Sequence, residues 1–328
     1  MIDNKKYLLG IDTGSSKTHA LISDLSGNVV GFADAGCGNY ETVGVDAFTR
    51  ALNQVTEKAL ASARVSKDKI AAMGFGFSGY DWPSEADLMD KAIKSLEIPC
   101  PYQFVNDVTI GLIAGSSQGW GIAADAGTGN NVRGRDKSGK IGRITGNGIR
   151  SGELGGASEL VWAATICVNY AWSKRGQKTH LTQLLIKDAK VESENELIEG
   201  LAMGKIHLSS KLAIKILQLA RDGDPGAKNV VNFVATELAK NVNAVIRQLD
   251  FQNSAFEVIM IGSVFKAGEI YIKPFRDTIL QFAPQASFIR LCVPPVVGSV
   301  LLAGETVNIR SQAFRAKIIQ SAQEKLHH

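Results

Sequence analysis

The sequence predicts a two-lobed α/β protein with a duplicated core and a mostly helical insert in its second lobe. Its 328 residues are enough for two domains of about 150 residues each. A short apolar strand followed by a glycine-rich loop occurs twice, and the second copy lies 113 residues after the first. Between residues 151 and 249 the apolar residues are spaced as in helices, which indicates the insert.

The composition is typical of a globular protein. Hydrophobic residues make up 45% and charged residues 21%, and no apolar run reaches the ~18 residues that span a bilayer. Residues 1–6 are polar and lack the apolar core of a signal peptide. The net charge of +4 is small, and no Lys/Arg block is interleaved with aromatic residues. We therefore expect a cytoplasmic protein with neither a membrane nor a nucleic acid as partner.

Three strands and a helix are expected at the start of the chain. Residues 7–11 form an apolar run that ends in Asp12, and residues 17–23 follow as a second strand. Together they predict a hairpin with an acidic tip. Residues 29–33 are a third strand, and residues 45–63 carry apolar side chains at helical spacing.

The second half repeats this opening. Residues 121–124 form an apolar strand that leads into Asp125, which corresponds to Asp12. Gly127 corresponds to Gly14, and the Ser-Gly turn that follows each loop also matches with a shift of one residue. Because chance alone would rarely align both the acidic tip and the turn, we expect an internal duplication.

The remaining elements fit the same plan. Apolar strands at residues 70–77 and 258–261 each end in a small-residue loop. Residues 102–105 form a further strand before Asn106-Asp107, residues 108–114 look helical, and residues 312–326 form a final helix.

These elements predict the domain boundaries. We expect an N-terminal lobe of residues 1–115, joined by the C-terminal helix 310–328. The second lobe is expected at residues 116–309, with the insert at 151–249.

The two glycine-rich loops are candidate phosphate sites. Small residues let backbone N–H groups approach phosphate oxygens, and the aspartate can hold the metal that accompanies a nucleotide. Two such loops facing each other would clamp a triphosphate, which predicts ATP and Mg²⁺, with Asp12 at the metal. A glycine at a hairpin tip also has a purely conformational use. The candidate nucleotide-binding residues are Gly14, Ser15, Ser16, Lys17 and Thr18 in the first loop and Gly127, Thr128, Gly129 and Asn130 in the second.

Two further positions have a functional and a structural interpretation. Asp107 follows an apolar strand, where open α/β sheets place reactive groups, and it could accept a hydroxyl proton during phosphoryl transfer. It could equally cap the helix that starts near Val108. Gly38-Asn39 could present a carboxamide to a sugar hydroxyl or form only a turn.

With these residues in place, the chain resembles the N-acetylglucosamine kinase branch of the BadF/BadG/BcrA/BcrD-type ATPase family, within the actin-like superfamily. The resemblance covers nearly the whole chain. Its motifs are Gly10-Ile11-Asp12-Thr13-Gly14-Ser15-Ser16-Lys17-Thr18, Gly36-Cys37-Gly38-Asn39-Tyr40, Phe77-Ser78-Gly79-Tyr80-Asp81, Asn106-Asp107 and Ala126-Gly127-Thr128-Gly129-Asn130-Asn131, followed by Gly262-Ser263-Val264-Phe265-Lys266 and the segment from Pro295 to Gly304.

The resemblance implies an actin-like ATPase fold, in which each lobe has a ribonuclease H-like core, and an ATP-dependent kinase for an amino sugar. It implies that Asp12 lies near magnesium and that Asp107 is the catalytic base. Homodimers are common among similar kinases. The implied sugar-binding residues are Gly38, Asn39, Asn106 and Thr128, and the implied adenosine-binding residues are Gly262, Ser263, Gly298 and Ser299.

The sequence departs from the family pattern near the sugar site. Residues 152–156 read Gly-Glu-Leu-Gly-Gly where the family has Gly-Asp-Glu-Gly-Ser, so Glu153 stands in place of the aspartate. A glutamate can still accept hydrogen bonds from a sugar, but its carboxylate is displaced by one methylene. Asn147 replaces the usual tryptophan. The acceptor therefore stays open among N-acetylglucosamine, glucosamine, N-acetylmuramic acid and glucose.

Two other functions stay open as alternatives. One is an ATPase of the kind that activates 2-hydroxyacyl-CoA dehydratases, which needs cysteine ligands for an iron–sulfur cluster. The four cysteines do not stand in the glycine-flanked motifs of that branch; they are Cys37, Cys100, Cys167 and Cys292. The other is a non-catalytic nucleotide-binding protein of the actin type.

Overall fold

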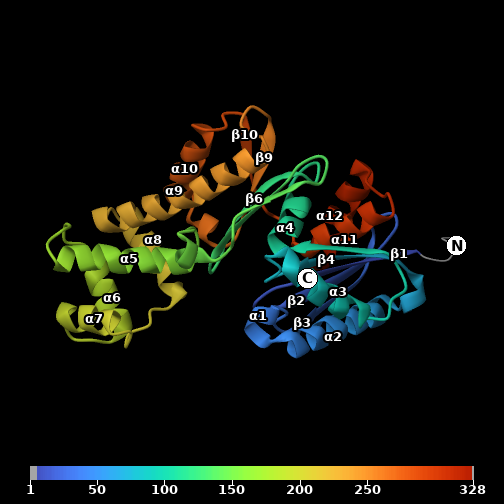
Figure 1. The fold of residues 1–328 in the computed structure, drawn as a ribbon, viewed down its shortest axis with the longest axis horizontal. Helices are drawn as coiled ribbons and strands as arrows, with labels where there is room; N and C mark the ends of the chain where they lie inside the picture. The colour runs from blue at the N-terminus through green and yellow to red at the C-terminus, as the bar shows by residue number, and fades with distance from the viewer. Residues whose placement is uncertain (1–5, 327–328) are drawn as a thin grey trace. The chain divides into compact units, whose positions relative to one another are not determined.

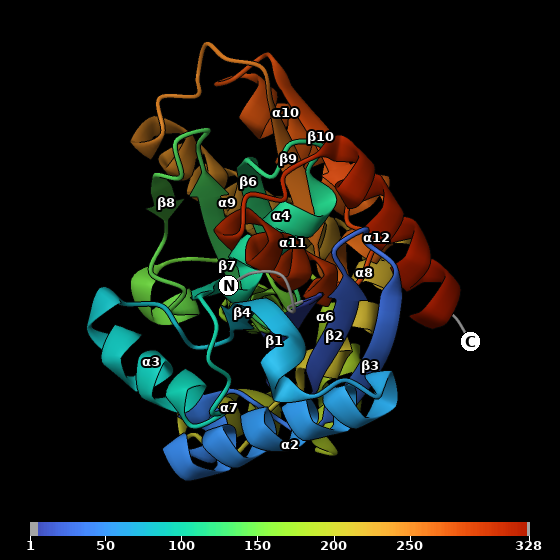
Figure 2. The same ribbon diagram turned by 90° about the vertical axis from the view of Figure 1, so that its right-hand side faces the viewer.

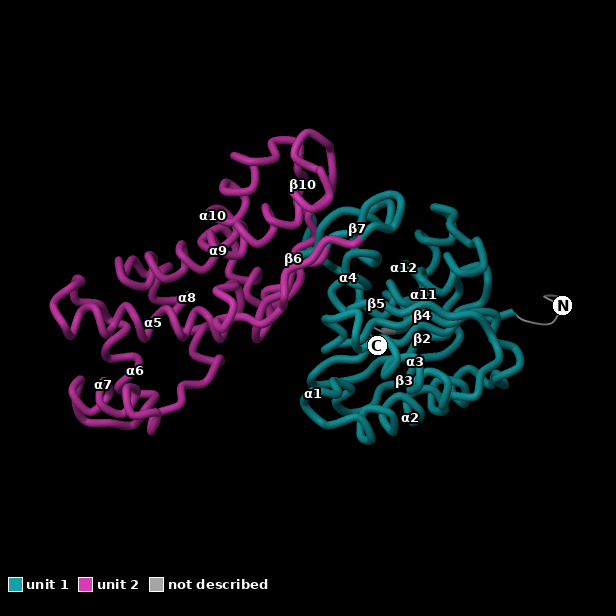
Figure 3. The backbone as a smooth tube through the Cα atoms, viewed as in Figure 1, with its two compact units in different colours: residues 1–123, 134–140, 289–328 teal, residues 124–133, 141–288 magenta. Residues whose placement is uncertain are grey.

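The computed structural model describes residues 6–326, and it divides the chain into two compact units (Figure 3). Unit 1 comprises residues 1–123, 134–140 and 289–328, and unit 2 comprises residues 124–133 and 141–288. The structure contains two five-stranded sheets with helices packed on them (Figure 1). This arrangement confirms the predicted α/β fold.

The sheet of unit 1 has the strand order β3-β2-β1-β4-β5. β1 pairs antiparallel with β2 and parallel with β4, and β4 pairs parallel with β5. β1 continues through Asp12 to Thr13, one residue beyond the expected acidic tip, and β4 coincides with the predicted strand. The bounds are β1 Tyr7–Thr13, β2 Thr18–Asp24, β3 Val29–Ala35, β4 Ile70–Phe77 and β5 Tyr102–Asn106.

Helices cover both faces of this sheet (Figure 2). On one face α2 buries Phe48, Leu52, Val55 and Ala59, whose spacing of three or four residues places them on one side of the helix. On the other face α11 lies against β1, β4 and α4. The bounds are α1 Tyr40–Val43, α2 Val45–Ala63, α3 Ala86–Lys94, α4 Asp107–Gly115, α11 Val296–Thr306 and α12 Gln312–Leu326.

The second sheet has the order β10-β9-β6-β7-β8, and helices of unit 2 account for most of residues 151–249. The longest of these helices, α9, begins at Pro225 and is capped by Asp224, whose side chain accepts a hydrogen bond from the Ala227 N–H at 2.8 Å. The predicted insert is therefore helical. The bounds are β6 Gly121–Ala126, β7 Asn130–Arg135, β8 Ile141–Arg143, β9 Phe256–Ile261, β10 Ala286–Arg290, α5 Ala157–Trp172, α6 Leu181–Ala189, α7 Glu194–Ala202, α8 Ala213–Arg221, α9 Pro225–Gln248 and α10 Glu269–Leu280. 

The division into units differs from the expected boundary at residues 116–123, 134–140 and 289–309, all of which belong to unit 1, and the last of these segments is the largest. Residues 289–309 belong to unit 1, whereas the sequence places them in the second lobe. Residues 289–309 belong to unit 1 because they include α11, an apolar helix that is buried from Val296 to Gly304 against the sheet of unit 1.

Among residues 6–326, no helix has both the length and the hydrophobicity needed to cross a membrane.

Candidate active site

The first glycine loop, residues 13–17, joins β1 to β2 in unit 1. The Gly14 N–H donates to the Lys17 carbonyl at 2.9 Å, which closes the turn. Ser15, Ser16 and Lys17 are exposed, so their backbone N–H groups are accessible to an anion. Thr18 is a correction to the expected set: it is fully buried and its hydroxyl donates to the Gly36 carbonyl at 2.9 Å.

Asn39 connects the first glycine loop to the end of β4. Its Oδ1 accepts the Glu41 N–H at 2.9 Å, and its Nδ2 lies 3.4 Å from Ser15 Oγ and 3.1 Å from Ser78 Oγ. It therefore caps α1 and also positions a carboxamide beside the loop. Gly38 is buried, and a Cβ there would lie 2.3 Å from Thr18 Oγ1, so the structure gives it a packing role in place of the expected sugar contact.

Asp107 is the first residue of α4, at the carboxyl end of β5. Asn106 is the helix cap, because its Oδ1 accepts the Val108 N–H at 3.0 Å, and the interpretation of Asp107 as the cap is therefore wrong. The Asn106 carboxamide is buried and donates to Asp81 Oδ1 at 3.2 Å. Its side chain thus fixes the start of α4 and is not exposed to a sugar.

Asp12 and Asp107 influence each other electrostatically. Burial, and secondly the carboxylate of Asp107, raise the pKa of Asp12 to about 8. The parallel strands β1, β4 and β5 end at the same edge of the sheet, which brings these acids together with Ser78. Two carboxylates that disfavour each other's charge are suited to binding a cation.

The second glycine loop, residues 126–130, is attached to the N-terminus of α5 in unit 2. The N–H groups of Ala157 and Ser158 donate to the carbonyls of Gly127 and Thr128 at 3.0 and 2.9 Å. Thr128 and Gly129 are exposed, as a ligand-binding loop requires. Asn130 is different from expectation, because its side chain is buried and donates to the Glu153 carbonyl at 3.0 Å.

Glu153 is buried, and its carboxylate holds the neighbouring loop. Oε1 accepts the Thr145 N–H at 2.8 Å, and Oε2 accepts the Thr145 hydroxyl and the N–H groups of Gly146 and Asn147 at 2.9 to 3.1 Å. The expected direct sugar contact is thus replaced by a positioning role. The only sign of this positioning role in the sequence is the replacement of the family's aspartate by a glutamate, whose side chain is longer by one methylene.

This arrangement predicts the effect of Glu153→Gln. The amide has one acceptor oxygen, so at least one donor of residues 145–147 would face an N–H₂ group. Because hydrogen bonds to a charged group contribute about 1.5–3 kcal/mol, we expect urea denaturation to show a stability loss of that size. Glu199→Gln, at an exposed position of α7, is the control and should change little. Equal stability of the two variants would contradict the positioning role.

A cavity of about 530 Å³ in unit 2 adjoins the second glycine loop. Gly262 has φ +99°, and a Cβ there would lie 2.3 Å from the Ala126 carbonyl, so β9 approaches this loop as only glycine permits. The sequence motifs identify Gly127, Thr128, Ser263, Val264 and Lys266 in its wall. The lining residues that sequence reasoning missed come mostly from the helical insert, and they are Ala157, Ser210, Lys211, Ala213, Ile214, Leu217, Arg221 and Ala267.

The feature that points to these missed residues is the exposure of Ile214. This apolar side chain on α8 is 74% exposed, although contact of an apolar side chain with water is unfavourable. The sequence places it within an amphipathic helix, and its exposure becomes visible only once α8 is packed on α9 and α5.

Gly298 and Ser299 lie outside this cavity, which corrects the expected adenosine contact. Both are buried in α11 of unit 1. The Ser299 hydroxyl donates to the Ile11 carbonyl at 2.8 Å, and a Cβ on Gly298 would lie 2.0 Å from the Ile110 carbonyl. Their role is to pack α11 against β1 and α4.

Comparison with known proteins shows which family the chain resembles. Residues 9–303 match the model of the BadF/BadG/BcrA/BcrD ATPase family. The chain is 28% identical over 305 residues to an N-acetylmuramic acid/N-acetylglucosamine kinase of Clostridium acetobutylicum. The aligned residues cover 91% of this chain and 98% of the relative. It is 26% identical over 317 residues to an N-acetyl-D-glucosamine kinase of Dictyostelium discoideum, with 92% and 98% covered.

Solved structures show the same fold. A protein of Chromobacterium violaceum described as an N-acetylglucosamine kinase superposes with a TM-score of 0.66 at 20% identity, covering 92% of this chain and 99% of the other. A glucokinase of Streptomyces griseus, solved with glucose and AMPPNP, superposes with a TM-score of 0.56 at 19% identity, again covering 92% and 99%. The family match extends over most of the chain, and the protein therefore belongs to the BadF/BadG/BcrA/BcrD ATPase family.

Proposed function

We propose that the protein is a kinase that transfers the γ-phosphate of ATP to a hydroxyl of an amino sugar, N-acetylglucosamine or a close relative. The observation that carries this proposal is the grouping of Asp12, Asn39 and Asp107 around the first glycine loop. A phosphate-binding loop beside a carboxylate suits transfer to a hydroxyl. The names of both curated relatives support an amino sugar as acceptor.

In unit 1, Asp107 is proposed to accept the proton of the attacking hydroxyl. Its place at the start of α4 is fixed by the Asn106 cap and by its own Oδ1, which accepts the Val108 N–H at 2.9 Å. The Asn39 carboxamide, held between Ser15 and Ser78, is proposed to orient the sugar. A fixed base and a fixed sugar lower the entropic part of the barrier.

In unit 2, the second glycine loop, with its exposed residues Thr128 and Gly129, is proposed to bind phosphate oxygens through its backbone N–H groups. The adjoining cavity of about 530 Å³ is of a size that suits adenosine. Ile214 and Leu217 provide apolar surface for the base, and Lys211 and Lys266 provide positive charge near the phosphates.

Asp12 is proposed to hold Mg²⁺. The residues fit this ion, since a partly buried carboxylate with a pKa raised to about 8 beside a second carboxylate is stabilised by a divalent cation. When bound, Mg²⁺ would neutralise phosphate charge as the γ-phosphate leaves. The protein's own contribution is to orient that carboxylate at the end of β1.

The proposal is tested by ADP release in a coupled assay with Mg²⁺ and ATP, against amino sugars and hexoses. We expect ADP release to depend on the sugar and to be fastest with an N-acetylated amino sugar. ADP release that is equal with and without every sugar would favour an ATPase instead.

We further propose a cytoplasmic location, because ATP, the proposed phosphate donor, is abundant in the cytoplasm.

We also propose that the protein forms a homodimer. α5 and α9 expose Tyr170, Trp172 and Phe233, each 44% accessible, and Tyr170 and Phe233 line an apolar cavity of about 440 Å³. A second copy of the chain is the proposed partner of this surface. Light scattering should give a dimer for the native chain and a monomer for Phe233→Glu. A native monomer would reject this assignment.

A further inference from the structure

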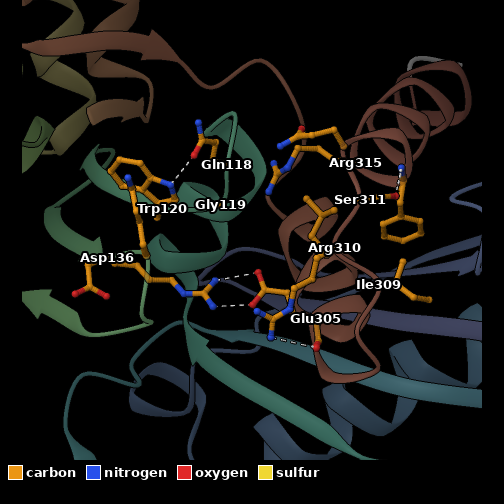
Figure 4. Close-up of a pocket in the computed structure, with 14 residues that line it drawn as sticks. Gln118, Gly119, Trp120, Asp136, Glu305, Ile309, Arg310, Ser311 and Arg315 are labelled. Atoms are coloured by element: carbon orange, nitrogen blue, oxygen red, sulfur yellow. Dashed lines mark hydrogen bonds and ion pairs between the residues drawn. The ribbon is translucent and has the colours of Figure 1, made fainter. Parts of the chain in front are cut away.

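A small cavity in unit 1 lies among residues that have no part in the proposed kinase site (Figure 4). Its volume is about 130 Å³. Three segments that are distant in the sequence build it: residues 118–120 before β6, residues 135–137 at the end of β7, and residues 301–315 from α11 to α12.

The cavity has an excess of positive charge. Four basic and two acidic side chains line it. Arg135 and Glu305 neutralise each other in a bidentate pair with N–O distances of 3.1 and 2.6 Å. Asp136 uses its Oδ1 to accept the N–H groups of Ser138 and Lys140, both at 2.8 Å, so this carboxylate organises its own turn. The carboxylate of Asp136 keeps its negative charge, so with Lys137, Arg310 and Arg315 the lining has a net excess of two positive charges.

Arg315 is held rigidly at the wall of the cavity. Its Nη1 donates to the carbonyls of Ile113 and Ser116 at 2.7 and 2.9 Å, and these dipoles orient the guanidinium without cancelling its charge. Gly119 permits the close approach, because it has φ +77° and a Cβ there would lie 3.2 Å from Arg315 Nη2. Figure 4 shows Arg315 beside Gln118 and Gly119.

Lys137 and Arg310 add two exposed positive charges to the lining of the cavity. Both are exposed; Lys137 Nζ lies 4.8 Å from the centre of the Trp120 ring, and Arg310 donates a long hydrogen bond of 3.5 Å to the Glu305 carbonyl. Such side chains can turn toward an anion at little cost.

The N-terminus of α12 adds to the positive potential of the cavity. This helix has 15 residues, and the Ser311 hydroxyl accepts the Phe314 N–H at 3.1 Å in its first turn. The positive end of the helix dipole therefore lies at Ser311 and Gln312, which both line the cavity.

We propose that this cavity binds a phosphate group, either as inorganic phosphate or as the end of a small phosphate monoester. Cavities for whole cofactors have about 300–1,000 Å³, so this one is too small for a nucleotide but large enough for a phosphate. A guanidinium, an ammonium and a helix N-terminus are the groups that bind phosphate in proteins. The bound phosphate would join the three segments that form the cavity.

Calorimetric titration of the full chain tests this site with two probes, inorganic phosphate and glycerol 3-phosphate, with chloride at equal ionic strength and glycerol as blanks. The double variant Lys137→Ala/Arg310→Ala should bind the preferred probe at least about tenfold more weakly. The control, Arg50→Ala/Lys91→Ala, removes two exposed charges from α2 and α3 and should bind as the native chain does.

The two probes distinguish the sources of the phosphate. Tighter binding of glycerol 3-phosphate supports a monoester, and equal binding supports phosphate alone. If neither probe binds, or if the double variant binds as tightly as the native chain, the site is overturned, and in the second case the phosphate binds elsewhere on the chain. Arg310→Glu, an exposed charge reversal, provides a second variant, and circular dichroism checks that each variant is folded.

Discussion

Asp107→Asn is expected to reduce the turnover number of the sugar-dependent reaction by about 10²–10⁴, because a positioned general base contributes that much to a proton transfer. The amide keeps the size of the side chain and can still accept the Val108 N–H that Asp107 Oδ1 accepts at 2.9 Å. The helix start is in any case fixed by the Asn106 cap. The fold should therefore be retained while the base is lost.

Steady-state kinetics and thermal unfolding check this prediction together. We expect kcat to fall, KM for the sugar to change little, and the melting temperature to stay within a few degrees. Asp87→Asn, at an exposed position of α3, is the matched control and should leave kcat unchanged. An Asp107→Asn protein with more than half of the native kcat would show that another group accepts the proton.

Gly298→Ala is expected to destabilise unit 1 strongly. The Cβ would lie 2.0 Å from the Ile110 carbonyl and 2.8 Å from its carbon, so α11 and α4 would have to separate. In a helix this exchange otherwise stabilises by about 0.5–1 kcal/mol, whereas overpacking of a buried contact costs about 1–3 kcal/mol or more. The clash with fixed backbone atoms decides the sign.

Denaturant unfolding should therefore show a net loss of about 1–3 kcal/mol or a chain that fails to fold. Gly36→Ala is the control within unit 1, because no atom lies within 4 Å of its added Cβ. If Gly298→Ala were as stable as Gly36→Ala, the close packing of α11 on α4 would be refuted.

Sequence reasoning reached the five strands of unit 1, β6, β9 and the two glycine loops because local signals specify them, whereas it did not identify β8 or β10. An apolar run, a glycine and a small-residue turn are short-range features, and the duplication gave each loop an independent copy. The helix at residues 45–63 was predicted to the residue, since its apolar positions follow a single face.

The sequence was a poorer guide to the direction in which individual side chains point. Thr18 belongs to β2, where alternate residues point to opposite faces, and its register with Ala35 turns the hydroxyl toward Gly36. Glu153 and Asn130 were expected at the ligand because of their motifs, yet nearby backbone groups engage their side chains. Such hydrogen bonds depend on the folded loop and not on spacing.

The part of the proposed adenosine cavity's wall that comes from the helical insert could not be predicted. Lys211, Ile214 and Arg221 lie in a helical insert without a motif, and they meet the second glycine loop only through packing of α8 on α9. The placement of residues 289–309 in unit 1 likewise depends on long-range contacts of α11.

The most direct test of the central claim is phosphorus NMR of the reaction of ATP, Mg²⁺ and N-acetylglucosamine with the native protein. The proposed function predicts a new phosphomonoester signal of the sugar that grows in step with ADP, and no such signal with Asp107→Asn. If inorganic phosphate accumulates in place of a sugar phosphate, the protein is an ATPase and the assignment of a sugar acceptor is contradicted.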